Sequence, residues 1–202
     1  MKKERNPFSI KLIACVGMFC AVAFVVTLLS KLIPVNVAGF LSLDFKDVIV
    51  AIGGLLFGPV PAIIISVIVS LIEMITISST GPIGLLMNIL STCAFVLPAA
   101  FVYKARRKFS GALIGLIAGV AAMTGVMLLW NWLITPLYMG VPREVVAAML
   151  IPTFLPFNLI KGGMNAALTL LLYKPIVSGL RRAGLVKPAG SSGKVKKGTS
   201  IG

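Results

Sequence analysis

The sequence contains no histidine, and only five of its 202 residues are acidic. Without histidine there can be no catalytic triad, general base or metal site that uses imidazole. The chain has no G-x-x-x-x-G-K-[ST] motif and therefore no P-loop for ATP hydrolysis. No two acidic residues have the spacing of metal ligands or of glycosidase carboxylates. The sequence therefore does not indicate an enzyme, and it offers no energy source of its own.

Cysteine is also scarce. The three cysteines, Cys15, Cys20 and Cys93, all lie inside apolar stretches, and their spacing fits neither a disulfide scaffold nor a zinc site. We expect them to be buried as small hydrophobic residues.

Charged residues make up only 12% of the chain, whereas 58% of its residues are hydrophobic and the mean hydropathy is +1.06. A soluble domain usually carries about a quarter charged residues, and a helix needs roughly 20 apolar residues to cross a bilayer. Proline and glycine divide the chain into six apolar runs, which predict an all-α membrane protein, a bundle of six transmembrane helices. The runs cover residues 8–33, 45–57, 62–79, 82–103, 111–138 and 153–180.

The net charge of +14 comes from short basic segments that flank the apolar runs. Such flanking cations set membrane orientation, so we do not expect nucleic acid as a partner. All but four of the 19 basic residues fall on one side if both termini are cytoplasmic; the others are Lys31, Lys46 and Arg143 in outer loops and Lys161 within the last run. We therefore expect cytoplasmic termini in a multi-pass protein of the plasma membrane.

Three segments are expected along the chain. Residues 1–7 form a basic cytoplasmic N-terminus, and residues 8–180 form the six-helix transmembrane domain that binds the substrate. Residues 181–202 form a basic cytoplasmic tail that we expect to be disordered, since its last stretch, 189–202, is rich in Gly, Ser and Lys.

Polar residues inside a membrane helix are costly and usually face a cavity or a partner. Asn158, Lys161 and Asn165 lie at i, i+3 and i+7 in the last run, which places them on one helix face. One ammonium and two carboxamides on one stripe can hydrogen-bond a polar heterocyclic or polyhydroxylated ligand. Alternatively, Lys161 extends to the outer interface and Asn165 bonds a neighbouring helix.

Glu73 and Asn88 are two further polar residues in apolar helices. Glu73 could pair with Lys161, bond a ligand, or form an ion pair that is only structural. Asn88 could face the same cavity or only join two helices.

The first outer loop, residues 34–47, is long and mostly apolar. It could close over a ligand, or it could be an interfacial hairpin. Trp130, Asn131, Trp132 and Tyr138 suit an aromatic belt at the membrane surface, although a planar ligand could also stack there.

Small residues at intervals of four mark helix contacts. Gly111, Gly115 and Gly119 form one such stripe, and Gly17-x-x-x-Ala21 in the first run forms another. On spacing alone, packing within the bundle is the main interpretation, and docking of another subunit is the alternative.

Four segments resemble the riboflavin-specific substrate-binding (S) components of energy-coupling factor (ECF) transporters, the RibU family. The LDF-x-D element and the FGP element recur in several vitamin S components, whereas GPIG…N and N-x-x-K point to riboflavin. The segments are LSLDFKD at 41–47, LFGP at 56–59, TGPIG at 80–84 followed by Asn88, and PFNLIKG at 156–162.

The resemblance implies a six-helix fold that captures riboflavin from outside with high affinity. It also implies an energising module of one transmembrane coupling protein and two ATPase subunits. Riboflavin is then the transported ligand, and no cofactor is expected. The alternatives are an S component for another vitamin and a stand-alone secondary transporter for a small solute.

The resemblance also assigns residues. Asn158 and Lys161 contact the vitamin, the loop wraps the flavin ring, and Gly17 and Ala21 meet the coupling protein where the family has Ala-x-x-x-Ala. Ser42 stands where the family commonly has Thr, which keeps the hydroxyl. The expected riboflavin-binding residues are Asn158, Lys161, Asn165, Asn88, Glu73, Leu41, Ser42, Leu43, Asp44 and Phe45.

Overall fold

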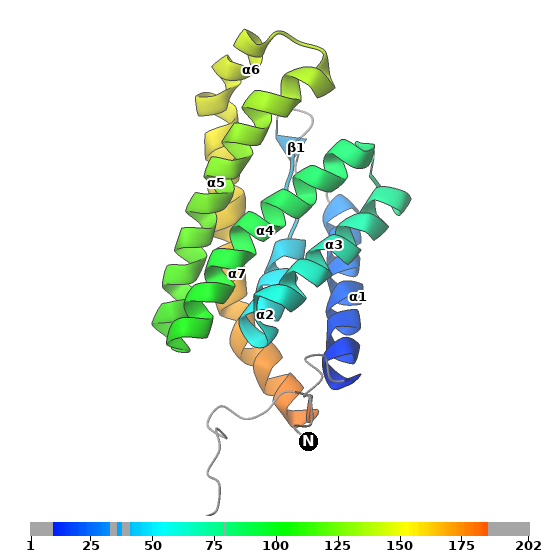
Figure 1. Ribbon diagram of the computed structural model, residues 1–202, viewed down its shortest axis with the longest axis vertical. Coiled ribbons are helices and arrows are strands. Elements are labelled where there is room, and N and C mark those ends of the chain that lie inside the picture. Colours follow the sequence, from blue (N-terminus) through cyan, green and yellow to red (C-terminus); the bar gives the residue numbers. More distant parts are fainter. Residues whose placement is uncertain (1–9, 33–35, 38–40, 79, 186–202) are drawn as a thin grey trace, which may run out of the picture.

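The computed structural model describes residues 10–32, 36–37, 41–78 and 80–185 (Figure 1). The expectations for the N-terminal segment 1–7 and for the tail beyond residue 185 concern residues outside this part of the chain.

The secondary structure of the described residues is helical apart from one short hairpin in the first loop (Figure 1). The hairpin pairs β1 with β2 in antiparallel register, Val37 opposite Leu41. The elements in chain order are α1 Ile10–Leu32, β1 Asn36–Val37, β2 Leu41–Ser42, α2 Lys46–Phe57, α3 Pro59–Thr76, α4 Gly81–Arg106, α5 Phe109–Met139, α6 Arg143–Met149, the π-helical segment η1 Leu150–Phe154, and α7 Leu155–Arg182.

Local chemistry explains the break between α2 and α3. Gly58 adopts φ 97°, which a residue with a Cβ rarely tolerates, and its N–H donates to the Gly54 carbonyl to close α2. Pro59 then begins α3, where its missing N–H costs no helical hydrogen bond. The predicted end of the second run at Phe57 is confirmed, whereas α3 begins three residues earlier than the predicted third run.

The expectation of six spans is only partly met. Among the described residues, five helical segments are long and apolar enough to cross a membrane, counting α6, η1 and α7 as one. Helix α2 has 12 residues, which is about 18 Å at 1.5 Å per residue. It therefore cannot cross about 30 Å of hydrocarbon alone. Ten of its residues are buried, so α2 is instead enclosed by the protein.

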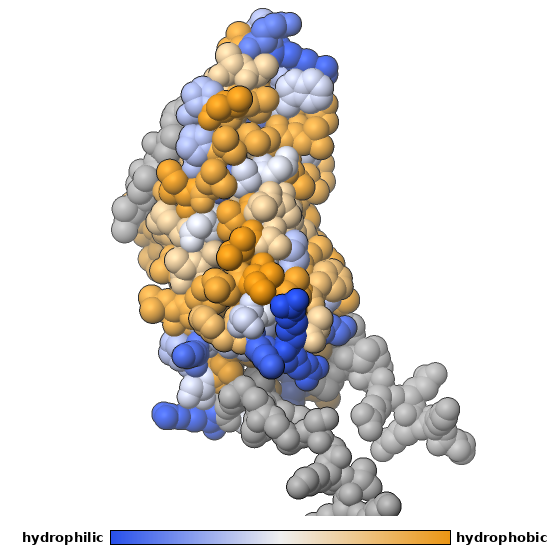
Figure 2. All heavy atoms as spheres, turned by 90° about the vertical axis from the view of Figure 1, so that its left-hand side faces the viewer, coloured by the Kyte–Doolittle hydropathy of each residue, from blue (hydrophilic) through white to orange (hydrophobic). Residues whose placement is uncertain are grey.

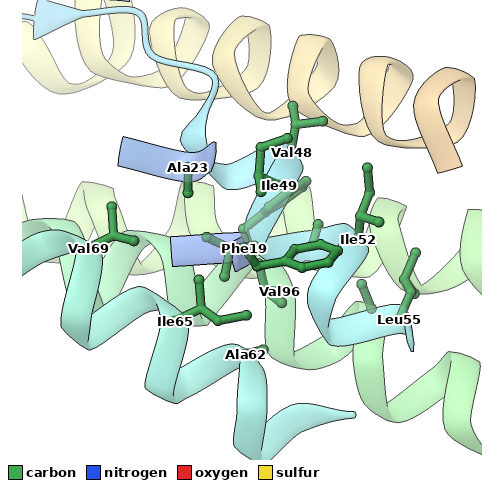
Figure 3. Packing of buried hydrophobic residues seen from close by; sticks show 14 of the residues in the cluster. Phe19, Ala23, Val48, Ile49, Ile52, Leu55, Ala62, Ile65, Val69 and Val96 are labelled. Carbon is green, nitrogen blue, oxygen red and sulfur yellow. The ribbon is translucent and has the colours of Figure 1, made fainter. Parts of the chain in front are cut away.

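The hydrophobic core is built around α2 (Figure 3). Phe19 from α1, Ile52 from α2 and Ile65 from α3 meet there, and α4 adds Val96. The outer faces of the long helices are also apolar, as the space-filling view of the α5 side illustrates (Figure 2). Ile75 and Leu137, for example, are 78% and 74% exposed. Both the interior and the outer surface are therefore apolar, as expected for a protein surrounded by lipid.

The glycine stripe of α5 packs against α4, so the prediction of packing within the bundle is confirmed for these glycines. A Cβ at Gly115 would lie 2.8 Å from the Cα of Ala99, and one at Gly119 would overlap the carbonyl of Phe95. The two backbones can approach this closely only because no side chain lies between them.

Gly119→Ala is therefore expected to destabilise the protein by about 1–3 kcal/mol, because the new methyl meets a helix backbone that cannot move aside cheaply. Thermal unfolding in detergent would measure the change. Gly125→Ala is the matched control on the same helix, since nothing lies within 4 Å of a Cβ there. Equal melting temperatures for the two variants would contradict the packing argument.

Two features between α5 and α7 differ from the expectation. The sequence predicted a single helix over 153–180, but a short helix, α6, comes first and a π-helical segment, η1, joins it to α7. Short π-helical segments often mark functional sites, because they leave backbone groups free of the regular pattern. Asn158 bonds the carbonyl of the last residue of η1, as described below.

Candidate ligand-binding site

The site forms where the first loop enters α2. Three side chains there form hydrogen bonds of 2.6–2.7 Å, each to a different helix. They belong to Asp44, Lys46 and Asp47. The loop is thereby joined to α7, α3 and α4 at one level of the bundle.

The first link is the ion pair between Lys161 on α7 and Asp44 in the loop. Lys161 Nζ donates to Asp44 Oδ2 at 2.7 Å, and both side chains are largely buried. Burial would raise the pKa of Asp44, but the ammonium groups of Lys161 and Lys46 outweigh this and hold the pKa below its ordinary value. Lys161 therefore points inward, and the alternative in which it extends to the outer interface is wrong.

The second link joins Lys46 on α2 to Glu73 on α3. Lys46 Nζ donates to Glu73 Oε2 at 2.6 Å, and Lys46 is only 2% exposed. The sequence had placed Lys46 in an outer loop, which is wrong, because this residue begins α2 inside the protein. The suggested pair between Glu73 and Lys161 is not the one formed; each residue has another partner.

The third link is a hydrogen bond from Thr92 Oγ1 on α4 to Asp47 Oδ1, at 2.6 Å. Asp47 is fully buried, and Thr92 is 1% exposed. Neither residue was a predicted site residue. Because Lys46 and Asp47 are adjacent at the start of α2, the N-terminus of this helix is held from two sides.

Several buried side-chain polar atoms have no hydrogen-bond partner within the described chain. They include both atoms of the Asn165 carboxamide, which is completely buried one turn below Lys161. A buried amide without partners costs about 1–3 kcal/mol, so such groups usually meet a ligand or ordered water. The other atoms are Asp44 Oδ1, Asp47 Oδ2, Ser70 Oγ and Thr124 Oγ1.

Asn158 lies on the same buried face of α7. Its Nδ2 donates to the Phe154 carbonyl at 2.8 Å, at the last residue of η1. The predicted stripe of Asn158, Lys161 and Asn165 is buried as a set, with exposures of 3%, 9% and 0%. The spacing argument from the sequence is confirmed for all three.

The other residues predicted to bind the ligand take no part in the three links described above. Leu43 and Phe45 flank Asp44 and are half-buried. Asn88 is half-buried in α4, and none of the hydrogen bonds found among the described residues uses its side chain. The backbones of Leu41 and Ser42 form β2, and their side chains lie outside the described part.

The residues that the sequence suggested for an aromatic belt near the end of α5 divide between the surface and the interior. Trp132 is 43% exposed, and the Arg143 guanidinium lies 6.0 Å from its ring centre. Asn131, by contrast, is buried and bonds Met127 and Thr135 within its own helix. Trp132 thus suits the aromatic belt, whereas Asn131 belongs to the interior.

The small-residue stripe of α1 differs from that of α5. Gly17 and Ala21 are exposed, and nothing lies within 4 Å of a Cβ at Gly17. This stripe is not used for packing among the described helices.

Comparison with known proteins identifies the family of this chain. Residues 11–173 match the family "ECF transporter, substrate-specific component". The chain belongs to this family. S components are transporter subunits and not enzymes, and this one is a multi-pass protein of the cell membrane.

Relatives of this S component include the riboflavin transporter FmnP of Bacillus subtilis (strain 168), which is 32% identical over 76% of this chain and 85% of its own length. The riboflavin transporter RibU of Staphylococcus aureus (strain TCH60) is 29% identical over 90% of this chain and 98% of its own. The solved S component of a bacterial ECF transporter superposes with a TM-score of 0.72 at 30% identity, covering 85% of this chain and 98% of that one.

Proposed function

We propose that this S component captures riboflavin from outside the cell and delivers it with an ATP-driven module. The observation that carries the proposal is the buried polar face of α7, where an ammonium paired to the first loop lies one turn from a carboxamide without partners. The two relatives named riboflavin transporters support the choice of vitamin.

The chemistry of the site suits riboflavin, which has a planar ring and an uncharged polyol. An ammonium has three N–H donors, and Asp44 takes one from Lys161, which leaves others for hydroxyl or carbonyl oxygens. The Asn165 amide can both donate and accept. Asn158, Asn88, Leu43 and Phe45 are proposed as further contacts.

Some residues receive a different role. We assign Asp44 and Glu73 to the ion pairs that hold Lys161 and Lys46, so their contribution to riboflavin binding is mainly to position the loop and α2. Leu41 and Ser42 are proposed to cover the ring, in keeping with their place in the loop.

The partners are proposed from the family. They are a transmembrane coupling protein and two ATPase subunits, and the exposed Gly17 and Ala21 on α1 would meet the coupling protein. We further propose that α2 completes a six-helix bundle in the membrane and that both termini are cytoplasmic.

The direct test is an absorbance spectrum of the detergent-purified protein, followed by titration with riboflavin while flavin fluorescence is recorded. Bound flavin, or stoichiometric quenching at nanomolar concentrations, is the expected result. Colourless protein that does not quench would contradict the proposal. Competition by thiamine or pantothenate at equal concentration would indicate a different vitamin.

Asn165→Leu offers a second test that separates binding from folding. Leucine removes two buried polar atoms that lack partners, so the ligand-free protein is expected to be as stable as the original or more so. The thermal stabilisation produced by saturating riboflavin, about 2.7 kcal/mol at 100 times Kd in the original protein, is expected to shrink or vanish.

Thr169→Val is the matched control, because Thr169 is equally buried one turn further along α7 and bonds only the Asn165 carbonyl within its own helix. This variant should keep the full riboflavin response. If Asn165→Leu also keeps the full riboflavin response, the Asn165 carboxamide does not contact the vitamin.

A further inference from the structure

A cluster of cations lies where α4 meets α5, far along both helices from the ligand site. Lys104 and Arg106 end α4, Arg107 closes it with φ 44°, and Lys108 precedes α5. All four are exposed. We call these residues, together with Lys174, the basic cluster.

Lys174 joins the cluster from α7. Its Nζ lies 5.9 Å from the ring centre of Phe109, the first residue of α5. The helix ends are held together there, since the hydroxyls of Tyr103 on α4 and Tyr173 on α7 lie 2.6 Å apart. The cations of α4, α7 and the turn before α5 therefore share one end of the bundle.

No carboxylate within the described chain balances this charge. The two salt bridges found there belong to the ligand site, and they use Asp44 and Glu73. The described part of the chain holds two other acidic residues: Asp47 is also in that site, and Glu144 lies on α6, beyond the other end of α5. The fifth acidic residue, Glu4, lies outside the described part. The basic cluster must therefore find its counter-anions outside the described protein.

An apolar stripe on α5 continues directly from the cluster. Phe109, Leu113 and Ile117 are spaced four residues apart, so they lie on one helix face. They are 59%, 40% and 61% exposed. In Figure 2, which views the α5 side, hydrophilic residues gather toward the lower end and an apolar surface lies above them.

We propose that the basic cluster and this stripe together bind an anionic phospholipid. The headgroup phosphate lies among Arg106, Lys108 and Lys174, and an acyl chain follows Phe109, Leu113 and Ile117 along α5. Cations at the membrane surface attract anionic lipids, and the stripe supplies the adjoining apolar surface that a free phosphate or an acidic protein loop does not need. Nothing in this proposal depends on which vitamin the other site takes.

Native mass spectrometry with added phosphatidylglycerol or phosphatidylcholine tests the proposal. The unaltered chain is expected to bind phosphatidylglycerol in preference. The triple variant Arg106→Gln, Lys108→Gln, Lys174→Gln should bind it on the order of 100-fold more weakly. Unchanged riboflavin binding by the same variant would show that it is folded.

Single variants provide the matched control. Lys174 and Arg143 are both exposed cations that lie near an aromatic ring. Lys174 lies near Phe109, whereas Arg143 lies near Trp132 at the opposite end of α5. Lys174→Gln should weaken phosphatidylglycerol binding roughly fivefold, and Arg143→Gln should leave it unchanged. Equal effects of the two would overturn a localised site.

Two further outcomes would also overturn the proposal. If inorganic phosphate or short-chain phosphatidylglycerol competes as well as the long-chain lipid, the α5 stripe takes no part. If the triple variant keeps its lipid preference but no longer assembles with the ATP-driven module, the cluster is a surface for an acidic protein.

Discussion

Replacing Lys161 with alanine is expected to weaken riboflavin binding by on the order of 100-fold or more. The change removes the ammonium proposed to contact the vitamin and leaves the Asp44 carboxylate buried without its partner on α7. Losing one member of a buried ion pair usually costs 3–5 kcal/mol. Titration of purified protein, with quenching of flavin fluorescence as the signal, would measure the change.

Comparison variants make the result specific. Asn158 lies one turn from Lys161 on the same buried face, so Asn158→Ala should also weaken riboflavin binding strongly. Trp132→Phe alters an exposed residue that contacts Arg143, and it should have little effect. Equal losses for all three variants would mean that the α7 face has no special role.

A double variant separates ligand contact from structural pairing. Lys161→Met combined with Asp44→Asn removes both charges of this ion pair, so neither member is left without its partner and stability should recover relative to Lys161→Ala. Riboflavin affinity should stay low, because the ammonium itself is gone. If the double variant binds riboflavin normally, Lys161 serves only to hold the loop.

Gly17→Leu is expected to abolish riboflavin uptake while leaving riboflavin binding intact. Gly17 is exposed on α1, and the space around it is empty among the described residues, so a larger side chain should not disturb the fold. In the proposed complex, the same side chain would separate two helices that need close backbone approach. Uptake by cells that contain the ATP-driven module, together with binding by the purified variant, would show the difference.

Gly125→Leu is the control, because Gly125 is also exposed with nothing within 4 Å, but it lies on α5. It should preserve both uptake and binding. Uptake that survives Gly17→Leu would exclude the α1 stripe as the docking face. Uptake by vesicles that lack every partner subunit would instead favour a stand-alone transporter.

Hydropathy predicted the long helices well. The length of an apolar run is a local property of the sequence, and it decides whether a helix can cross the bilayer. Hydropathy also located α2, whose short apolar run of 12 residues is enclosed by other helices. An apolar run looks the same whether lipid or protein surrounds it. The short helix α6 and the π-helical segment η1 were not predicted, because neither has a simple hydrophobic periodicity in the sequence.

The candidate site was predicted in part. The i, i+3, i+7 spacing placed Asn158, Lys161 and Asn165 on one face, and all three are buried. Helix geometry alone was enough for that prediction, since it depends only on residues within two turns. Thr92 was not predicted, because a threonine in an apolar helix most often bonds its own backbone.

The sequence by itself determined that this chain is a helical membrane protein without histidine chemistry or a nucleotide site, since composition and run length decide those points. Only the tertiary structure decided which charges pair. Lys161 meets Asp44 across 117 residues, Lys46 meets Glu73 across 27, and Thr92 meets Asp47 across 45. Such partners are chosen by how the helices pack around α2, and a one-dimensional pattern contains no distance between helices.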